Sequence, residues 1–346
     1  MTTLTTLLGV ATPLIQAPMA GSQGAALAAA VAQAGALGSL PAAMLTPEAL
    51  QRELQTLQAS AGKAFNVNFF CHTPPEPDAQ REAAWRALLA PHYAKAGLDI
   101  AQAPSGPGRV PFNDAAAEVL EAFRPRVVSF HFGLPSPALL RRVKAWGAVV
   151  LSSATTVEEG LWLQANGADV VIAQGLEAGG HRGHFLSHEL SRQMGTLALV
   201  RQLVLALDVP VVAAGGIADA AGVRAAMALG AAGVQVGTAY LRSDEASTSA
   251  VHRAALASPQ ATHTALTTVF SGRPARGIVN HAMRELGFMP AAAPAFPLAT
   301  AAIAPLRSHA EAQGSGDFSP LWAGQAASAC RDGSARDITL ALAQGF

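Results

Sequence analysis

The most distinctive chemical feature of this chain is a histidine within a glycine-rich run. Residues 174–183 read Gln-Gly-Leu-Glu-Ala-Gly-Gly-His-Arg-Gly, and they follow an apolar stretch at 169–173 that predicts a strand. A histidine on such a loop can act as a general base or as a hydrogen-bond donor to a substrate. A solvated loop histidine is the simpler alternative, but a place directly after a strand favours function. We therefore predict that His181 is catalytic and contacts substrate.

Two glycine sites follow the last two predicted strands. Gly215-Gly216 comes after the apolar run 209–213, and Gly237-Thr238 comes after the run 234–236. Glycines let backbone N–H groups approach an anion closely, and the start of a helix adds a favourable partial charge. A single Gly-Gly pair could simply turn a strand into a helix, but two such sites on neighbouring strands favour a bound phosphate. The pattern does not name the ligand.

Polar side chains end other predicted strands. Asn68 and Gln174 carry amides, which would suit the pyrimidine edge of a flavin, although either could be a plain strand-end residue. His131 ends another strand and is either a substrate contact or a core histidine, and both possibilities stay open. His184 and His188 lack the acidic partners of a metal site, so no metal is predicted.

These residues need a scaffold that brings strand ends together, and the apolar pattern indicates one. Short apolar runs alternate with helical stretches, as expected for parallel strands covered on both faces. Eight such strands predict an α/β fold, the (β/α)₈ TIM barrel, with its function at the C-terminal strand ends. A doubly wound open sheet is the alternative, but no Gly-x-Gly-x-x-Gly turn follows the first strand. The predicted strands are 14–19, 37–40, 65–70, 127–132, 149–153, 169–173, 209–213 and 234–236. The predicted helices are 25–34, 46–60, 80–89, 137–146, 157–166, 196–207 and 219–229.

Two segments depart from this alternation. Residues 71–114 are rich in proline and too long for an ordinary connection, and residues 241–320 are a helical, proline-interrupted tail. We predict that 1–70 and 115–240 form the cofactor-binding barrel, and that the two departing segments form a substrate-side subdomain or lid. The C-terminal segment 321–346 is expected to return to the barrel.

The composition disfavours several classes of protein. Lys plus Arg and Asp plus Glu both number 23 and aromatic residues are 5%, so no nucleic-acid partner is expected. Glycines and a proline break the apolar stretch 25–45, which predicts a buried helix and strand rather than a membrane span. No targeting signal is recognised, so a cytoplasmic location is expected. Cys71 and Cys330 are too few for a disulfide framework, and Cys71-His72 lacks a second metal-binding cluster.

Several motifs, taken in order, resemble the nitronate monooxygenase family, once called 2-nitropropane dioxygenases. The likeness covers nearly the whole chain. Residues 69–72 (FFCH) and 129–133 (SFHFG) resemble the class I branch rather than the NADH:quinone reductase branch. The other motifs are 15–21 (IQAPMAG), 65–68 (FNVN), 173–175 (AQG), 177–183 (EAGGHRG), 213–217 (AAGGI), 235–238 (QVGT), 271–277 (SGRPARG) and 322–325 (WAGQ).

This resemblance implies a flavoprotein monooxygenase with non-covalent FMN. Such an enzyme oxidises alkyl nitronates, for example propionate 3-nitronate, with O₂ to nitrite and a carbonyl product, and the expected role is detoxification. His181 matches the family's active-site histidine, and His131 is a further substrate-contact candidate. The residues expected to contact FMN are Ala17, Pro18, Met19, Asn68, Gln174, Gly179, Gly180, Gly215, Gly216, Gln235, Val236, Gly237, Thr238, Trp322 and Gln325.

Other functions remain open on the same scaffold. An NAD(P)H-dependent flavin reductase, acting on a quinone or an enoyl thioester, is the main alternative. A flavin-free sugar-phosphate lyase is disfavoured because no lysine ends a predicted strand, and a non-enzymatic binding protein is disfavoured by the crowded strand ends. Arg182, Arg273 and Arg276 could attract an anionic substrate or stabilise the fold. The exact nitronate and the oligomeric state stay open.

Overall fold

A barrel of eight parallel strands forms the centre of the computed structural model, which describes residues 3–62, 64–106 and 108–346. The strands follow the order β1-β9-β8-β6-β5-β4-β3-β2, and a parallel bridge between Ile15 and Leu37 joins the two ends. The TIM-barrel prediction is therefore confirmed. The strands are β1 (Leu14–Gln16), β2 (Gly38–Pro41), β3 (Phe65–Phe70), β4 (Val127–His131), β5 (Val149–Ala154), β6 (Val170–Gln174), β8 (Val211–Ala214) and β9 (Gly233–Val236).

The predicted barrel elements lie close to their expected positions. All eight strands are present, with small shifts at their ends. The largest shift is at β1, which ends at Gln16 rather than at residue 19. Pro18 lacks the backbone N–H that a ladder needs, so the strand cannot continue through it. The chain instead opens into the loop of Pro18 and Met19.

Helices cover the outside of the barrel, and most begin at a polar side chain that accepts a backbone N–H. Thr46, Asn113, Ser136, Thr156 and Asp219 are such N-caps. The short α1 (Leu4–Leu8) and α5 (Asp114–Phe123) were not among the predicted helices. The covering helices are α2 (Ala25–Gln33), α3 (Pro47–Ala61), α5, α6 (Pro137–Ala145), α7 (Val157–Ala165), α8 (Thr196–Ala206) and α9 (Ala220–Ala228).

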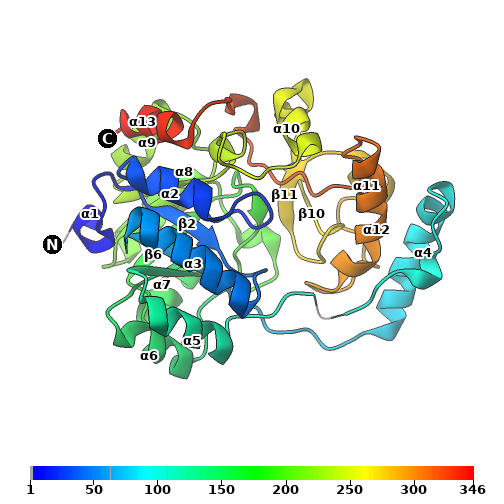
Figure 1. Ribbon diagram of the computed structural model, residues 1–346, viewed down its shortest axis with the longest axis horizontal. Coiled ribbons are helices and arrows are strands. Elements are labelled where there is room, and N and C mark those ends of the chain that lie inside the picture. Colours follow the sequence, from blue (N-terminus) through cyan, green and yellow to red (C-terminus); the bar gives the residue numbers. More distant parts are fainter. Residues whose placement is uncertain (1–2, 63, 107) are drawn as a thin grey trace.

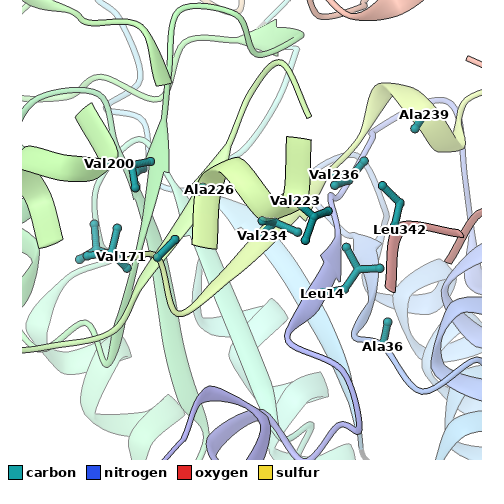
Figure 2. Close-up of a cluster of buried hydrophobic side chains, with 14 of the residues drawn as sticks. Leu14, Ala36, Val171, Val200, Val223, Ala226, Val234, Val236, Ala239 and Leu342 are labelled. Atoms are coloured by element: carbon teal, nitrogen blue, oxygen red, sulfur yellow. The ribbon is translucent and has the colours of Figure 1, made fainter. Parts of the chain in front are cut away.

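The largest apolar cluster lies between the barrel strands and their helices. Leu14 and Val234 on two paired strands meet Val223 of α9 and Leu342 of the C-terminal helix α13 (Ala335–Ala343) in one buried group (Figure 2). Figure 1 shows α13 beside α9, close to the N-terminal half of the barrel. Burial of these side chains holds the strand ends in fixed positions.

A second, smaller sheet lies outside the barrel and was not predicted from the sequence. It consists of β7 (Gly180–His181), β10 (Thr264–Thr267) and β11 (Ala275–Ile278), with antiparallel pairing throughout. His181 is paired with Ala275 in this sheet. Two of its strands, β10 and β11, lie after residue 241, so the tail is not helical throughout as the sequence analysis expected. Each of the two has only four residues, and the sheet forms through pairing between them and with the distant β7, which no local pattern signals.

The two segments that depart from the barrel pattern pack against each other. Trp85 and Tyr93 of α4 (Ala79–Lys95) donate hydrogen bonds to the carbonyls of Ala299 and Ala302, at 3.2 Å and 2.5 Å. Both carbonyls belong to α12 (Ala299–Ala312). Figure 1 shows α4 in cyan beside α12 in orange, on the opposite side of the molecule from α1. The two segments thus share one apolar core.

The remaining helices and turns are short. They are α10 (Ala250–Ala257), α11 (His281–Glu285) and the 3₁₀ turns at Ile100–Gln102, Leu190–Arg192, Thr238–Tyr240, Pro259–Thr262 and Ala327–Ala329. Among the described residues, no helix is both long enough and apolar enough to cross a membrane.

Candidate active site

A cavity opens at the C-terminal ends of the barrel strands and collects most of the residues that the sequence singled out. It is lined by strand-end residues, by the loop after β6 and by the segment around Trp322. The predicted residues that line it are Ala17, Pro18, Met19, Asn68, His131, Gln174, Gly179, Gly180, His181, Gly215, Gly216, Gln235, Gly237, Thr238 and Trp322.

Two predicted cofactor residues are not placed at this cavity. Val236 is 1% exposed and packs with Val223 and Leu342 in the apolar cluster outside the barrel (Figure 2). Alternation along a strand turns neighbouring side chains to opposite faces, so Gln235 faces the cavity and Val236 does not. The Gln325 side chain is exposed, and the backbone N–H of Gln325 donates to the carbonyl of Glu177 at 2.9 Å. Neither residue lines the cavity.

His181 is half-buried among aromatic rings. Its Nε2 is 2.8 Å from the Ser271 hydroxyl, and the rings of Phe296, Trp322 and Phe70 lie 5.2, 5.5 and 6.3 Å from its own. Burial lowers the pKa of His181 well below its ordinary value, and the charge of Arg109 lowers it further. His181 is therefore a neutral imidazole at pH 7, able to accept a proton.

Two side chains, from Gln174 and His131, bind the backbone carbonyl of His181. Gln174 donates from Nε2 to the His181 carbonyl at 2.9 Å and accepts the Gly183 N–H at 2.7 Å. His131 Nε2 lies 3.1 Å from the same carbonyl, and since a carbonyl only accepts, this nitrogen carries the proton. Burial lowers the pKa of His131 to about 4, so its other nitrogen accepts from Ser153 at 3.0 Å. Both side chains position the loop.

Glycines shape the part of the cavity where a phosphate was expected. Gly215 and Gly216 have φ of 118° and 73°, conformations that other residues rarely adopt. A Cβ on Gly179 would lie 2.6 Å from the backbone of the segment that precedes Gly324. In the described ranges, the N–H groups of Gly216, Gly237 and Thr238 donate to no other atom of the chain. Such free amides around glycines fit a phosphate group.

The amides on the cavity wall also leave acceptors without partners. Gln235 Oε1 is buried and has no hydrogen-bond partner among the described residues. Asn68 donates from Nδ2 to the Ser129 hydroxyl at 2.9 Å, which leaves its Oδ1 as an acceptor. A buried amide oxygen is costly unless a ligand donates to it. The wall therefore fits a polar heterocycle, and a flavin carries both this kind of edge and a phosphate.

The three arginines considered in the sequence are tied to backbone carbonyls. Arg182 donates to the carbonyls of Gly175 and Gln174 at 2.7 and 2.8 Å. Arg273 donates to the carbonyl of His184, and its guanidinium lies 4.0 Å from the ring centre of Phe132. Arg276 donates to the carbonyl of Leu176 at 2.8 Å. Of the two roles considered, these contacts support the stabilisation of the fold.

Arg109 is a cavity residue that the sequence did not reveal. It lies in the 71–114 segment, lines the cavity, and lowers the pKa of His181 by its charge. Phe70 and Phe296 were also missed as parts of the wall around His181. A proline-rich stretch without periodicity gives no reason to prefer one of its cations. In the described ranges, no group of three His, Cys, Asp or Glu side chains could hold a metal ion.

Comparison with known proteins gives a consistent result. A family model described as nitronate monooxygenase matches residues 1–345. A nitronate monooxygenase of Pseudomonas aeruginosa is 42% identical over 98% of this chain and 97% of its own length. Another from Paraburkholderia phytofirmans is 41% identical over 97% of this chain and 92% of its own length.

Two solved structures share the fold of this chain over nearly its whole length. A nitroalkane oxidase from Streptomyces ansochromogenes superposes with a TM-score of 0.89 at 39% identity, covering 98% of this chain and 96% of its own. A FabK variant from Thermotoga maritima superposes with a TM-score of 0.72 at 25% identity, over 99% of this chain and 95% of its own. The nitronate monooxygenase family is flavin-dependent in general. From the full-length match, the barrel and the cavity at its strand ends, we conclude that this chain is an enzyme of the nitronate monooxygenase family.

Proposed function

We propose that this enzyme binds FMN without a covalent bond and oxidises alkyl nitronates with O₂ to nitrite and a carbonyl product. One observation carries the proposal: a neutral, half-buried histidine and a glycine-lined wall with free backbone amides lie in the same cavity. The family relation supports the substrate class.

The residues that would hold FMN divide by the part of the cofactor they fit. The amides of Gly216, Gly237 and Thr238 suit the phosphate, and the acceptors of Gln235 and Asn68 suit the donor groups on the ring edge. When bound, the flavin takes electrons from the substrate and passes them to O₂. The chain itself supplies position and electrostatics.

His181 would handle the proton of the substrate. As a neutral imidazole it can remove the carbon-bound proton of a neutral nitroalkane, and it can hydrogen-bond to a nitronate that is already deprotonated. Ser271 orients its ring, and Gln174 and His131 hold its backbone. The rings of Phe296 and Trp322 lie beside His181 and reduce the space open to water, which would strengthen the polar contacts of a bound substrate.

The first test uses the purified protein. Its visible spectrum and the cofactor released on denaturation should show FMN. Mixing with propionate 3-nitronate in the absence of air should change the flavin spectrum, and nitrite should form with O₂ consumption once air is admitted. If the flavin spectrum does not change with the nitronate but the flavin absorbance is lost with NADH, the result would support the reductase instead. A protein that binds no flavin would contradict the proposal.

A further inference from the structure

Arg109 is a half-buried cation in the cavity wall, and part of its guanidinium has no partner among the described residues. Its Nη1 is buried and makes no hydrogen bond to any described residue. Burial lowers the pKa of Arg109, but an arginine stays charged in proteins. Its guanidinium lies 5.4 Å from the ring centre of Phe296, which also contacts His181. A buried charge without a counter-ion is costly, and a ligand of opposite charge would remove that cost.

The described lining of the cavity contains no acidic side chain that could pair with Arg109. Among the described residues that line it, none is Asp or Glu, and Arg109 is the one Lys or Arg. The pKa values of His181, His131 and His72 are all lowered, with burial as the main cause, so these imidazoles are neutral at pH 7. An anion that enters the cavity therefore meets Arg109 as the cation of the described wall, whereas the guanidinium of Arg273 lies over the ring of Phe132 and donates to a backbone carbonyl.

The guanidinium also has a suitable shape. A nitronate spreads its negative charge over two oxygens on one planar group, as a carboxylate does. Arginine presents a planar fork of N–H donors that matches such a pair of oxygens, and the charge-assisted bonds are stronger in a water-poor pocket. The aromatic wall of Phe70 and Phe296 provides that pocket beside Arg109.

We propose that Arg109 determines specificity by pairing with the nitronate oxygens, so that the enzyme prefers the anionic nitronate to its neutral nitroalkane. This inference rests on the proposed function, because it assigns a residue to the substrate of that reaction. It assigns to Arg109 the contact with the substrate oxygens, whereas His181 keeps the proposed role of handling the proton.

The test compares Arg109→Gln with the wild type on propyl-1-nitronate and on freshly dissolved 1-nitropropane. A charge-assisted hydrogen bond in a buried site predicts that KM for the nitronate rises about 10- to 100-fold. KM for neutral 1-nitropropane should change little. Arg81→Gln is the matched control, because Arg81 is exposed on α4 in the same segment. Equal changes for both substrates, or no change for the nitronate, would overturn the inference.

Two further substrates locate the contact. Propionate 3-nitronate carries a nitronate and a carboxylate, whereas 3-nitropropionate carries the carboxylate alone. If Arg109→Gln weakens only the substrates that carry a carboxylate, Arg109 binds that group and the pairing with the nitronate is wrong. If the wild type releases no nitrite from any nitronate, the proposed function itself fails, and this outcome is distinct from an active wild type with an unaffected variant.

A measurement on the wild type needs no variant that might fail to fold. Acetate and acetamide have nearly the same size and shape, but only acetate is a planar anion. Acetate should compete with propyl-1-nitronate at least 10-fold more effectively than acetamide, by the same charge-assisted bond. Equal inhibition by the two compounds would contradict an anion-selective pocket.

Discussion

The chemistry of His181 depends on which groups contact it and which charges surround it. Its Nε2 contacts Ser271, its carbonyl accepts from Gln174 and His131, and the nearby charge of Arg109 disfavours protonation. An imidazole can act as a base only when it is unprotonated, that is, at a pH above its pKa. The lowered pKa therefore keeps His181 unprotonated even in mildly acidic solution.

Replacing this imidazole separates its two expected roles. His181→Asn keeps hydrogen-bonding capacity but removes the base, so kcat/KM for neutral 1-nitropropane should fall about 10²- to 10⁴-fold. The loss for propyl-1-nitronate should be clearly smaller, because that substrate needs no proton removal. Nitrite release from both substrates gives the ratio. His263→Asn, at an exposed histidine outside the cavity, serves as the control. Equal losses on both substrates would exclude proton abstraction by His181.

The loop after β6 is fixed by contacts with three other parts of the chain. The carboxylate of Glu177 accepts the N–H and the hydroxyl of Thr196, at the start of α8. Residues 180–181 pair with β11, and the backbone of Glu177 accepts from Gln325. Because the loop is held at several points, the backbone amides and His181 keep their positions relative to the barrel.

Replacing a glycine at the end of β8 by alanine should weaken cofactor binding. A Cβ on Gly215 would lie 2.9 Å from both the Ala178 nitrogen and the Thr196 hydroxyl, at φ 118°. Gly215→Ala should therefore cost about 1–3 kcal/mol at this site and raise the Kd for FMN at least 10-fold. The ratio of flavin to protein absorbance measures this. Gly222→Ala, within α9 and free of close contacts, should retain its flavin. Full flavin content in Gly215→Ala would refute the assignment of the cradle.

The molecule as a whole buries several histidines in the neutral state. Burial lowers the pKa of His131 to about 4, of His184 to about 3 and of His252 to about 4. An unfolded chain would titrate these groups near their ordinary value of 6.5. Below that value the unfolded state binds more protons than the folded state, so acid favours unfolding.

The folded state should therefore lose stability as the pH falls from about 6.5 toward 4. Each histidine contributes a loss of about 1.4 kcal/mol per pH unit in this window, and the full stability is present above it. Urea unfolding at pH 7 and pH 5 measures the difference. His252→Gln lies outside the cavity and should reduce the slope by the share of one histidine. A free energy of unfolding that is the same at both pH values would contradict the buried neutral state.

Trp85 and Tyr93 of α4 donate hydrogen bonds to backbone carbonyls of α12, and the two helices share one apolar core. This core also includes Phe270, which precedes Ser271 in the sequence. Arg109 follows α4 along the chain and reaches the cavity. That the two segments act as a lid over the substrate stays a prediction.

The barrel and much of the cavity could be predicted from the amino-acid sequence because their signals are local. Apolar runs marked the strands, and the glycine sites at 215–216 and 237 marked the cradle. His181 stood out because its neighbours along the chain are glycines. A barrel places every strand end at one face, so identifying strand ends was enough to bring most of these residues together.

Long-range contacts decided the rest. The pairing of His181 with β11, the approach of Arg109 to the aromatic pocket and the place of Val236 outside the barrel depend on residues far away in the sequence. The loss of hydration that lowers the pKa of His181 is likewise a property of the folded surroundings. The pattern of neighbouring residues in the sequence does not predict these contacts, because burial and the proximity of charges arise only when distant segments pack together.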